Sequence, residues 1–387
     1  MPSRIYNNVY DFRRAVRPLI GTGEAHRLLV INTGSASTKV AIYEGPNGVW
    51  SKNIQHSPDD LARYKSVSDQ LDFRKSAILR AVEEAGQSMD GLRAVVSRGG
   101  ALRPMPGGVY VIDETVLGDL AERPATKHAA NLSPPIAYAI AQPMGIPAYF
   151  VDPITVDEFE PLARLSGLPE LPRQSKLHAL SIRSTAHRTA QKLGMPLDKL
   201  NIIVAHLGSG ISICPVRRGR MIDVNGADDE GPFSPERAGS LCMSDLVELC
   251  FSGQYTKDDM IQKITRFSGL RAHLGTSDAR DVEKLIDSGD MHALEVATAM
   301  AYQVAREIGA MACVLSGDVT AIALTGGLAS WQRLVDEVAA RCSFIAPIHV
   351  FPGENEMEAL AQGALRVLNG LDHAKRYTAA DGGESRC

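Results

Sequence analysis

Two polar Gly/Ser turns, each set between two apolar stretches, are the clearest chemical signal in this chain. The first lies within LLVINTGSASTKVAIY (28–43) and the second within IIVAHLGSGISICPV (202–216). Such turns line up backbone N–H groups and hydroxyls where no bulky side chain blocks a ligand, as phosphate oxygens require. One of them alone would be weak evidence, but two about one domain length apart predict duplicated domains whose loops face a shared nucleotide. Their small and hydroxyl residues are Gly34, Ser35 and Ser37 in the first turn and Gly208, Ser209 and Gly210 in the second.

A second signal is an arginine placed where it could bind an anionic substrate. Arg98 follows the apolar run AVV (94–96) and precedes Gly99 and Gly100, which we expect to leave room for a substrate. A planar guanidinium binds a carboxylate through two parallel hydrogen bonds. A lone arginine after a strand is more often a surface ion-pair partner, so Arg98 by itself does not decide the function. The sequence contains neither GxxxxGK[ST] nor a GxGxxG motif after a strand, so phosphate handling falls to the paired turns.

The elements that must position these residues alternate between strands and helices, which predicts an α/β fold. Besides the two hairpins, apolar runs of strand length lie at 94–96, 148–151, 320–324 and 347–351. Helices are predicted at 68–86, 113–121, 128–142, 175–194, 243–250, 278–288, 291–316 and 356–368. The predicted organisation is an Arg-rich N-terminal extension at 1–26, domain I at 27–176 plus 357–372, domain II at 177–356 and a disordered tail at 373–387.

Composition excludes several classes of protein. The chain has 387 residues, 44% of them hydrophobic, which is enough for two domains with cores of their own. Its formal net charge of −4 gives no basic surface of the kind that nucleic acids select. No apolar run approaches the ~20 residues of a membrane helix. The cysteines are scattered and contain no CxxC pair, which favours a reducing cytoplasm over a disulfide framework or a zinc site.

A series of short motifs runs along most of the chain. NTGSASTK, VVSRGG, HAANL, VDPITVDE, HLGSGIS, GPFSPERAG, LTGG and PGENEMEAL follow one another between Asn32 and Leu360. In this order they resemble the acetate kinase family, most of all its butyrate kinases and branched-chain fatty acid kinases. The resemblance implies two duplicated ribonuclease-H-like (actin-like ATPase) domains with an interdomain nucleotide cleft, and a homodimer. It also implies reversible transfer of the γ-phosphoryl group of ATP to butyrate or a branched-chain acid, giving an acyl phosphate and ADP, with Mg²⁺ or alternatively Mn²⁺.

The resemblance assigns catalytic roles to particular residues. Arg237 in GPFSPERAG would neutralise the phosphoryl group in flight, and His178 and His206 would donate hydrogen bonds to it or to the carboxyl group. Asp152 could orient an arginine or contact the transferring group, and orientation is favoured since a carboxylate acceptor has no proton for a base to remove. The substrate-binding residues would be Arg98, Gly99, Gly100 and Leu177.

The nucleotide and the metal also receive expected partners. The nucleotide-binding residues would be Asn32, Gly34, Ser35, Ser37, Lys39, His206, Gly208, Ser209, Gly210, Asp278, Arg280, Gly326 and Gly327. Mg²⁺ prefers oxygen ligands and keeps several waters, so few protein groups are needed. Asn32 and Glu356 are the predicted metal residues, with Glu354 as the alternative acid.

Three other functions remain open from sequence alone. An acetate or propionate kinase would share the mechanism, but Gly99, Gly100 and Leu177, which replaces an aromatic residue common in relatives, favour a longer acyl chain. A sugar or polyol kinase would need a catalytic base and no arginine for the acceptor. A nucleotide-driven, actin-like ATPase would keep both turns without Arg98 and Arg237 and would hydrolyse ATP with no acid present.

Overall fold

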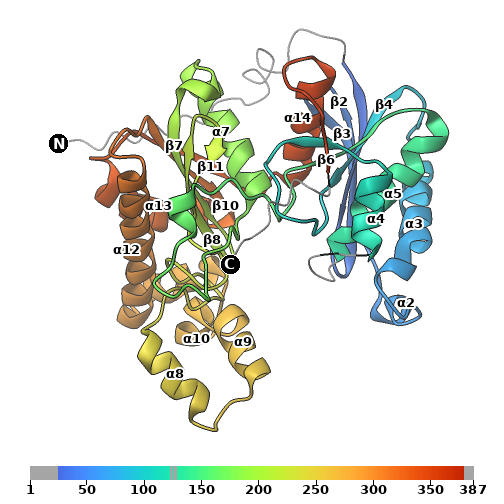
Figure 1. The fold of residues 1–387 in the computed structure, drawn as a ribbon. Helices are drawn as coiled ribbons and strands as arrows, with labels where there is room; N and C mark the ends of the chain where they lie inside the picture. Colours follow the sequence, from blue (N-terminus) through green and yellow to red (C-terminus); the bar gives the residue numbers. More distant parts are fainter. Residues whose placement is uncertain (1–24, 123, 125–128, 379–387) are drawn as a thin grey trace. The chain divides into compact units, whose positions relative to one another are not determined.

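The computed structural model describes residues 25–122, 124 and 129–378, which divide into two compact units (Figure 1). The first unit runs to Asp157 and resumes at Asn355, and the second unit spans Glu158–Glu354. The second unit is therefore inserted in the first. Most of the predicted extension at 1–26, His128 of the HAANL motif and residues 379–387 lie outside the described residues.

The units divide earlier than the predicted boundary at 176/177. Glu158 explains the difference, because its carboxylate accepts hydrogen bonds from Met221 N at 2.8 Å and Arg183 Nη2 at 2.8 Å, both in the second unit. Glu160 N donates to Ile222 O at 3.0 Å in the same unit. The segment after Asp157 thus packs with the second unit.

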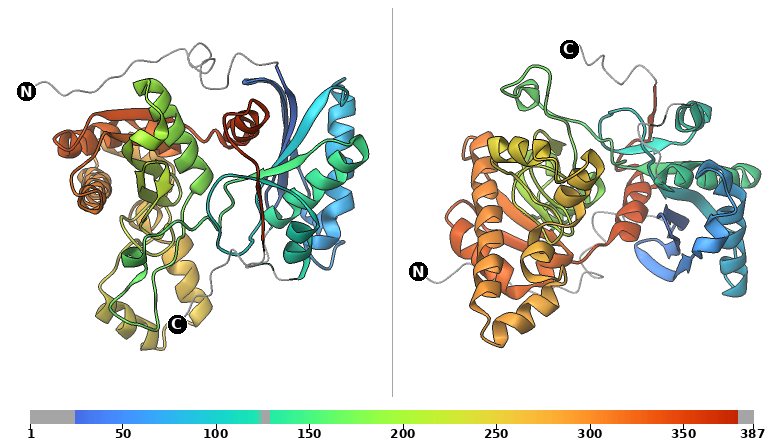
Figure 2. Two further views of the ribbon diagram at one scale, coloured as in Figure 1. Left: turned by 45° about the horizontal axis from the view of Figure 1, so that its top comes forward. Right: turned by 90° about the horizontal axis from the view of Figure 1, so that it is seen from below.

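The first unit is built on a seven-stranded sheet in the order β12-β5-β6-β4-β1-β2-β3. Its strands are β1 Arg27–Thr33, β2 Ser37–Glu44, β3 Asn47–Gln55, β4 Leu92–Arg98, β5 Val109–Val111, β6 Ala148–Val151 and β12 Lys375–Arg376. Its helices are α2 Pro58–Leu61, η1 Ser68–Gln70, α3 Leu71–Glu84, α4 Glu114–Glu122, η2 Ala129–Leu132, α5 Ser133–Ala141, η3 Gln142–Met144 and α14 Glu356–Leu368. Helix α14 covers one face of the sheet and α3, α4 and α5 cover the other (Figures 1 and 2). The sheet is covered on both faces, so the run Leu28–Ile31 of β1 is fully buried without polar alternation.

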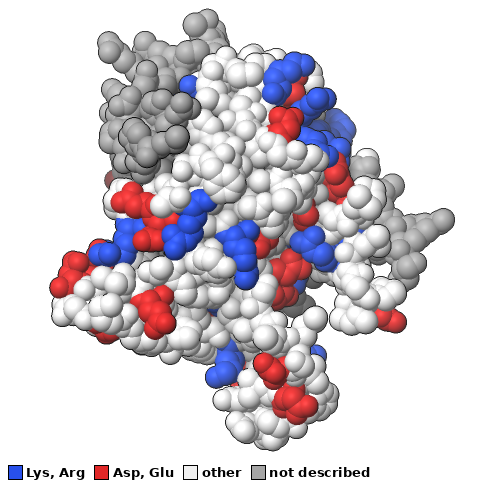
Figure 3. All heavy atoms as spheres, turned by 90° about the vertical axis from the view of Figure 1, so that its left-hand side faces the viewer, with Lys and Arg blue, Asp and Glu red and all other residues white. Residues whose placement is uncertain are grey.

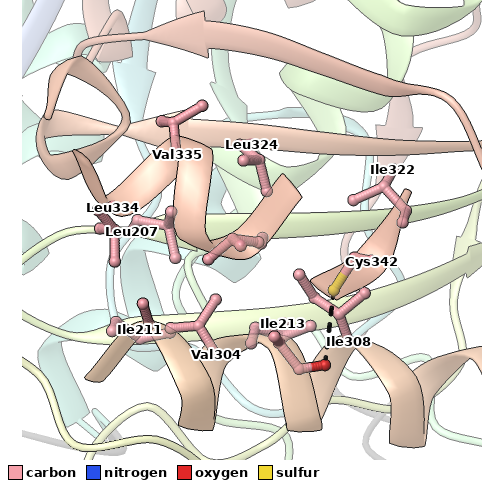
Figure 4. Packing of buried hydrophobic residues seen from close by; sticks show 14 of the residues in the cluster. Leu207, Ile211, Ile213, Val304, Ile308, Ile322, Leu324, Leu334, Val335 and Cys342 are labelled. Carbon is pink, nitrogen blue, oxygen red and sulfur yellow. Dashed lines mark hydrogen bonds between the residues drawn. The ribbon is translucent and has the colours of Figure 1, made fainter. Parts of the chain in front are cut away.

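The second unit has a five-stranded sheet in the order β11-β10-β7-β8-β9. Its strands are β7 Asn201–Leu207, β8 Ile211–Arg217, β9 Arg220–Met221, β10 Ala321–Gly326 and β11 Ile348–Pro352. Its helices are α6 Pro161–Arg164, α7 Ala179–Leu193, η4 Leu197–Lys199, α8 Met243–Phe251, α9 Lys257–Arg266, α10 Gly269–Leu274, α11 Ala279–Asp287, α12 Met291–Val314, η5 Gly327–Ser330 and α13 Gln332–Cys342. The apolar side chains of α12 and α13 pack against those of β7, β8 and β10 to form its core (Figure 4).

The two sheets repeat one strand pattern. In the first unit β6, β4 and β1 run parallel and β2 and β3 return antiparallel. In the second unit β11, β10 and β7 run parallel and β8 and β9 return antiparallel. Each Gly/Ser turn joins the first two strands of its repeat. The predicted α/β class with duplicated ribonuclease-H-like domains is confirmed.

Some local predictions are wrong. The helix predicted at 175–194 begins only at Ala179, so His178 is its N-cap residue and has a non-helical backbone. The predicted disordered tail contains β12, which pairs with β5. Tyr377 is 2% exposed and donates its hydroxyl to Asp119 Oδ2 at 2.6 Å, so this part of the tail is anchored by burial and hydrogen bonding.

Candidate active site

The first Gly/Ser turn joins β1 to β2, and hydrogen bonds to neighbouring residues hold its base. Thr33 N donates to Ser133 Oγ at 3.0 Å, and Thr33 Oγ1 donates to Ala129 O at 2.7 Å. Gly34 N donates to Ser37 O at 2.8 Å, which closes the turn. Ser35 and Ala36 at its tip are exposed. The predicted phosphate-binding residues therefore lie on a rigid base with an accessible tip.

A cluster of predicted site residues lies beside this turn, although its members are far apart in sequence. Glu356, at the start of α14, accepts a hydrogen bond from Asn32 Nδ2 at 2.8 Å through Oε2. Its Oε1 lies 3.3 Å from Arg98 Nη1, at the end of β4. Lys39 pairs with Asn32 across the β1–β2 ladder, so it stands on the same face of the sheet. The predicted acid-binding arginine and the predicted metal residues are thus brought together within the first unit.

Glycine is required at positions 99 and 100 for a different reason from the one predicted. A Cβ on Gly99 would lie 2.5 Å from Pro153 Cβ, and one on Gly100 would lie 2.7 Å from Leu120 Cδ2. The space beside these glycines is filled by the protein itself. The prediction that they leave room for a substrate is therefore wrong, and they serve close packing at the end of β4.

Asp152 is buried immediately after β6. It is 4% exposed, and its Oδ1 accepts the Gly108 N–H at 2.8 Å. Its φ of +37° is unusual for a residue with a side chain, and such strain is found more often at functional sites. The structure thus gives Asp152 a backbone partner, and its predicted role toward an arginine stays a prediction.

In the second unit, two histidines stack beside the second Gly/Ser turn. The His178 and His206 rings lie 4.1 Å apart between centroids with an interplanar angle of 20°. Their Nδ1 atoms are hydrogen-bonded to Ser212 Oγ at 2.9 Å and Ser181 Oγ at 2.8 Å, respectively. Burial, followed by the nearby His178 and Arg237, lowers the pKa of His206 well below its ordinary value. His206 is therefore a neutral ring at physiological pH, able to donate one hydrogen bond. Leu177, the predicted substrate contact beside this pair, is 7% exposed.

Arg237 lies directly against the second turn. A Cβ on Gly210 would fall 2.2 Å from Arg237 Nη1, so only glycine leaves room for the guanidinium there. Arg237 Nη1 also donates to Ala227 O at 2.6 Å and lies 2.9 Å from Asp228 Oδ1. The structure places this arginine at the second turn, and its predicted role toward the phosphoryl group stays a prediction. The carboxylate that pairs with it was not predicted.

Ser234 is a positioning residue that sequence reasoning missed. It is 1% exposed, donates its hydroxyl to Ser209 O and accepts a hydrogen bond from Arg237 N at 3.1 Å. It thereby ties the loop that carries Arg237 to the second turn. The signal was its place inside GPFSPERAG, between two prolines that restrict the loop.

The two candidate metal acids lie near different turns. The Glu354 Oε1 atom lies 3.7 Å from the position that a Cβ on Gly208 would occupy, in the second unit. Glu356 contacts Asn32 in the first unit. Among the described residues no group of three or more His, Cys, Asp or Glu is arranged to hold a metal ion. The oxygen donors of Asn32 and Glu356 fit a hard cation by type.

The other residues predicted to bind the nucleotide differ in what they do locally. Asp278 caps α11 by accepting Arg280 N at 2.9 Å, and the Arg280 side chain lowers the pKa of Asp278 to about 2. Gly326 has φ +91°, and a Cβ there would lie 2.3 Å from Leu207 O, so its own backbone requires glycine. A Cβ on Gly327 would meet nothing within 4 Å. Gly327 therefore borders open space, as a residue that lets a ligand approach would.

On the face drawn in Figure 3, acidic and basic side chains are interspersed and do not gather by sign. None of the helices in the described ranges is both long and apolar enough to cross a membrane.

Comparisons with known proteins point to one family. A family model described as the acetokinase family matches residues 171–358. "Probable butyrate kinase 2" of Caldanaerobacter subterraneus subsp. tengcongensis is 50% identical over 351 residues, covering 91% of this chain and 99% of that protein. "Butyrate kinase 2" of Clostridium acetobutylicum is 47% identical over 352 residues, covering 91% of this chain and 99% of that protein. The crystal structure of Porphyromonas gingivalis acetate kinase matches with a TM-score of 0.74 at 21% identity, covering 89% of this chain and all of that one, which shows a shared fold. The chain therefore belongs to the acetokinase family, and within it is similar to the butyrate kinases.

Proposed function

We propose that the chain is a butyrate kinase, which transfers the γ-phosphoryl group of ATP reversibly to a short-chain fatty acid. The observation that carries the proposal is the cluster of Arg98, Asn32 and Glu356 beside an accessible Gly/Ser turn. This cluster joins a guanidinium suited to a carboxylate with oxygen donors suited to a hard cation. The two similar proteins named butyrate kinase support the choice of acid.

The chemistry needs positive charge more than it needs a base. The attacking carboxylate is already anionic and is repelled by the triphosphate, so holding and neutralising charge should supply most of the rate. In the first unit, Arg98 would hold the acid and the tip of the first turn would donate N–H groups to phosphate oxygens. Mg²⁺, when bound, would neutralise phosphate oxygens, and Asn32 and Glu356 are the residues proposed to hold it.

The second unit would stabilise the transferring group. Arg237 is pre-positioned against Gly210, and it would exchange its contact with Asp228 for phosphoryl oxygens. His206 is neutral, and with Ser181 Oγ donating to its Nδ1, its Nε2–H would donate a hydrogen bond without adding a proton to the reaction. His178 is positioned through Ser212 for a similar role. Asp278, Arg280 and Gly327 are proposed to border the adenosine.

A homodimer is proposed from helix α8. None of its residues is buried, and Met243, Val247 and Phe251 are 81%, 54% and 87% exposed. Their i, i+4, i+8 spacing puts them on one face, which a second copy of the chain would cover. Sedimentation of the wild type and of Phe251→Glu tests this; a wild type that sediments as a monomer refutes it.

A cytoplasmic setting is proposed from the dispersed cysteines, of which Cys214, Cys242, Cys250, Cys313 and Cys342 are free.

The decisive experiment is trapping of acyl phosphate with hydroxylamine, using ATP, Mg²⁺ and acids of two to six carbons. A signal that peaks at butyrate or a branched acid supports the proposal. A peak at acetate or propionate keeps the mechanism and changes the substrate. ATP hydrolysis without a trapped product would refute the kinase and favour an ATPase.

A further inference from the structure

Arg74 of helix α3 is a fully buried cation and is not among the predicted site residues. Its side chain has 0% exposure and is among the largest fully buried side chains of the chain. None of the ion pairs found among the described residues involves Arg74. Within the described ranges its guanidinium donates hydrogen bonds only to neutral oxygens of Gly34, Ser35, Ser37, Thr38 and Gln70. Burial lowers the pKa of Arg74. An arginine nonetheless stays protonated at neutral pH, so no carboxylate of the described residues compensates its positive charge.

The neutral acceptors belong mainly to the first Gly/Ser turn. Arg74 Nη1 donates to Gly34 O at 2.9 Å and to Ser37 O at 3.1 Å, and Nη2 donates to Ser35 O at 2.8 Å. Gln70 Oε1 accepts from Nε at 3.0 Å and from Nη2 at 2.9 Å. The forked guanidinium thus gathers three carbonyls of one turn, which a lysine could not do with the same geometry.

Holding these carbonyls also aims the N–H groups of the turn. In a trans peptide the C=O of one residue and the N–H of the next point in opposite directions. With the Gly34 and Ser35 carbonyls held toward Arg74, the N–H groups of Ser35 and Ala36 point away from it. Within the described part of the chain these two N–H groups donate to no protein acceptor, and both residues are exposed. They are available to an anion at the tip of the turn.

We propose that Arg74 is a positioning residue for nucleotide phosphate: it holds the first turn with its N–H groups outward and supplies a buried positive charge behind them. The inference rests on the proposed function, because it takes this turn as the phosphate site. It explains why an unpaired cation is kept in the interior, where it is destabilising without a counter-charge. A bound phosphate would supply that counter-charge across the turn.

The test uses Gln70→Glu in the full chain. The substitution keeps the shape and the acceptors that hold Arg74, but puts a carboxylate next to the guanidinium. We expect an unchanged or higher melting temperature, since a buried charge gains a partner. We expect the dissociation constant of MgADP, measured by calorimetry, to rise about tenfold. The KM for butyrate at saturating ATP should stay within about twofold, because neutralisation acts on the phosphate site alone.

Two further variants sharpen the result. Arg74→Lys keeps the charge but loses the fork, so we expect weaker MgADP binding together with a lower melting temperature. Arg80→Gln removes an exposed charge from the same helix and is the matched control, expected to leave MgADP binding unchanged.

The outcomes separate this inference from the proposed function. Gln70→Glu with wild-type affinity for MgADP overturns the inference, as does an equal loss of affinity in Arg80→Gln. A wild type that binds no MgADP overturns it as well. A wild type that binds MgADP but forms no trapped acyl phosphate overturns the proposed function, while the loss of affinity in Gln70→Glu would still support the role of Arg74.

Discussion

Replacing Glu356 with glutamine tests two proposed effects of its carboxylate: it helps to bind Mg²⁺, and it pairs with Arg98 and so weakens the binding of the acid. Its Oε2 accepts Asn32 Nδ2 at 2.8 Å, and its Oε1 lies 3.3 Å from Arg98 Nη1, with the Arg98 and Glu356 side chains each 29% exposed. At that separation and an effective dielectric constant of about 20, two unit charges attract by about 5 kcal/mol. Solvent screening and side-chain ordering reduce the net value to about 1 kcal/mol. Glutamine keeps the shape and one oxygen, so the substitution removes mainly the charge.

Two kinetic changes are expected. The Mg²⁺ concentration at half-maximal rate should rise about 10- to 100-fold, because a proposed cation ligand loses its charge. Arg98, released from its ion pair, should bind the acid more tightly, so the KM for butyrate at saturating Mg²⁺ should fall about fivefold, which corresponds to about 1 kcal/mol. Initial rates of hydroxamate formation, measured across Mg²⁺ and across butyrate, give both values.

Glu354→Gln is the matched comparison, because Glu354 lies beside Gly208 in the second unit. If Glu354→Gln raises the Mg²⁺ requirement and Glu356→Gln does not, Glu354 is the metal-associated acid. A Glu356→Gln enzyme with an unchanged Mg²⁺ requirement and a lower KM would show that this carboxylate only neutralises Arg98. That result would refute the metal assignment of Asn32 and Glu356.

Three further predictions address the turns and the buried groups. Gly210→Ala should lower kcat about 10²-fold in the hydroxamate assay without unfolding the protein, because its Cβ would fall 2.2 Å from Arg237 Nη1 and displace that flexible side chain. Gly99→Ala should lower the free energy of unfolding by about 1–3 kcal/mol in urea titrations and leave the order of preferred acids unchanged, because its Cβ would lie 2.5 Å from Pro153 Cβ. The pKa of His206 is lowered mainly by burial, so the native ring stays neutral where the unfolded chain takes up a proton. The free energy of unfolding should therefore fall as the pH drops below about 6.5, by up to about 1.4 kcal/mol per pH unit from this group, and His206→Gln should flatten that slope.

Each of these has an informative control or failure. Gly309→Ala places a Cβ in open space within α12, so it should change neither kcat nor stability by the amounts given for the other glycines. Full activity in Gly210→Ala would mean that Arg237 acts from another position. A changed acid preference in Gly99→Ala would restore the view that this glycine borders the substrate. A wild-type pH slope in His206→Gln would assign the slope to other buried groups, such as His56 and His349.

The sequence predicted those strands and helices whose buried residues form a recognisable apolar pattern along the chain. Strands β1 and β7 are continuous apolar runs covered on both faces, and their hairpins and the closing helix Glu356–Leu368 were found at nearly their observed bounds. Strand β3 was missed because it is polar and largely exposed, so its backbone pairing with β2 defines it and its side chains carry no pattern.

The candidate site residues that lie in a recognisable motif were predicted from the sequence. Those whose role depends on three-dimensional packing were missed. The contact of Asn32 with Glu356 joins residues at opposite ends of the chain, and only matching motifs linked them. The role of Arg74 was not predicted, because a single arginine in an amphipathic helix is usually a surface residue. Only the folded structure shows that it donates hydrogen bonds to the first Gly/Ser turn. Gly99 was misinterpreted because a sequence does not show which atoms fill the space beside a glycine.

The insertion of the second unit into the first has a consequence for the order of folding during synthesis. Helix α14 buries Ala359–Leu365 against the sheet of the first unit, yet it is made after all of residues 158–354. Until it leaves the ribosome, the apolar face formed by β1, β4 and β6 has no cover, whereas every element of the second unit is already present. The inserted unit can therefore mature first, and the nascent first unit is the stage at which chaperones or aggregation would compete.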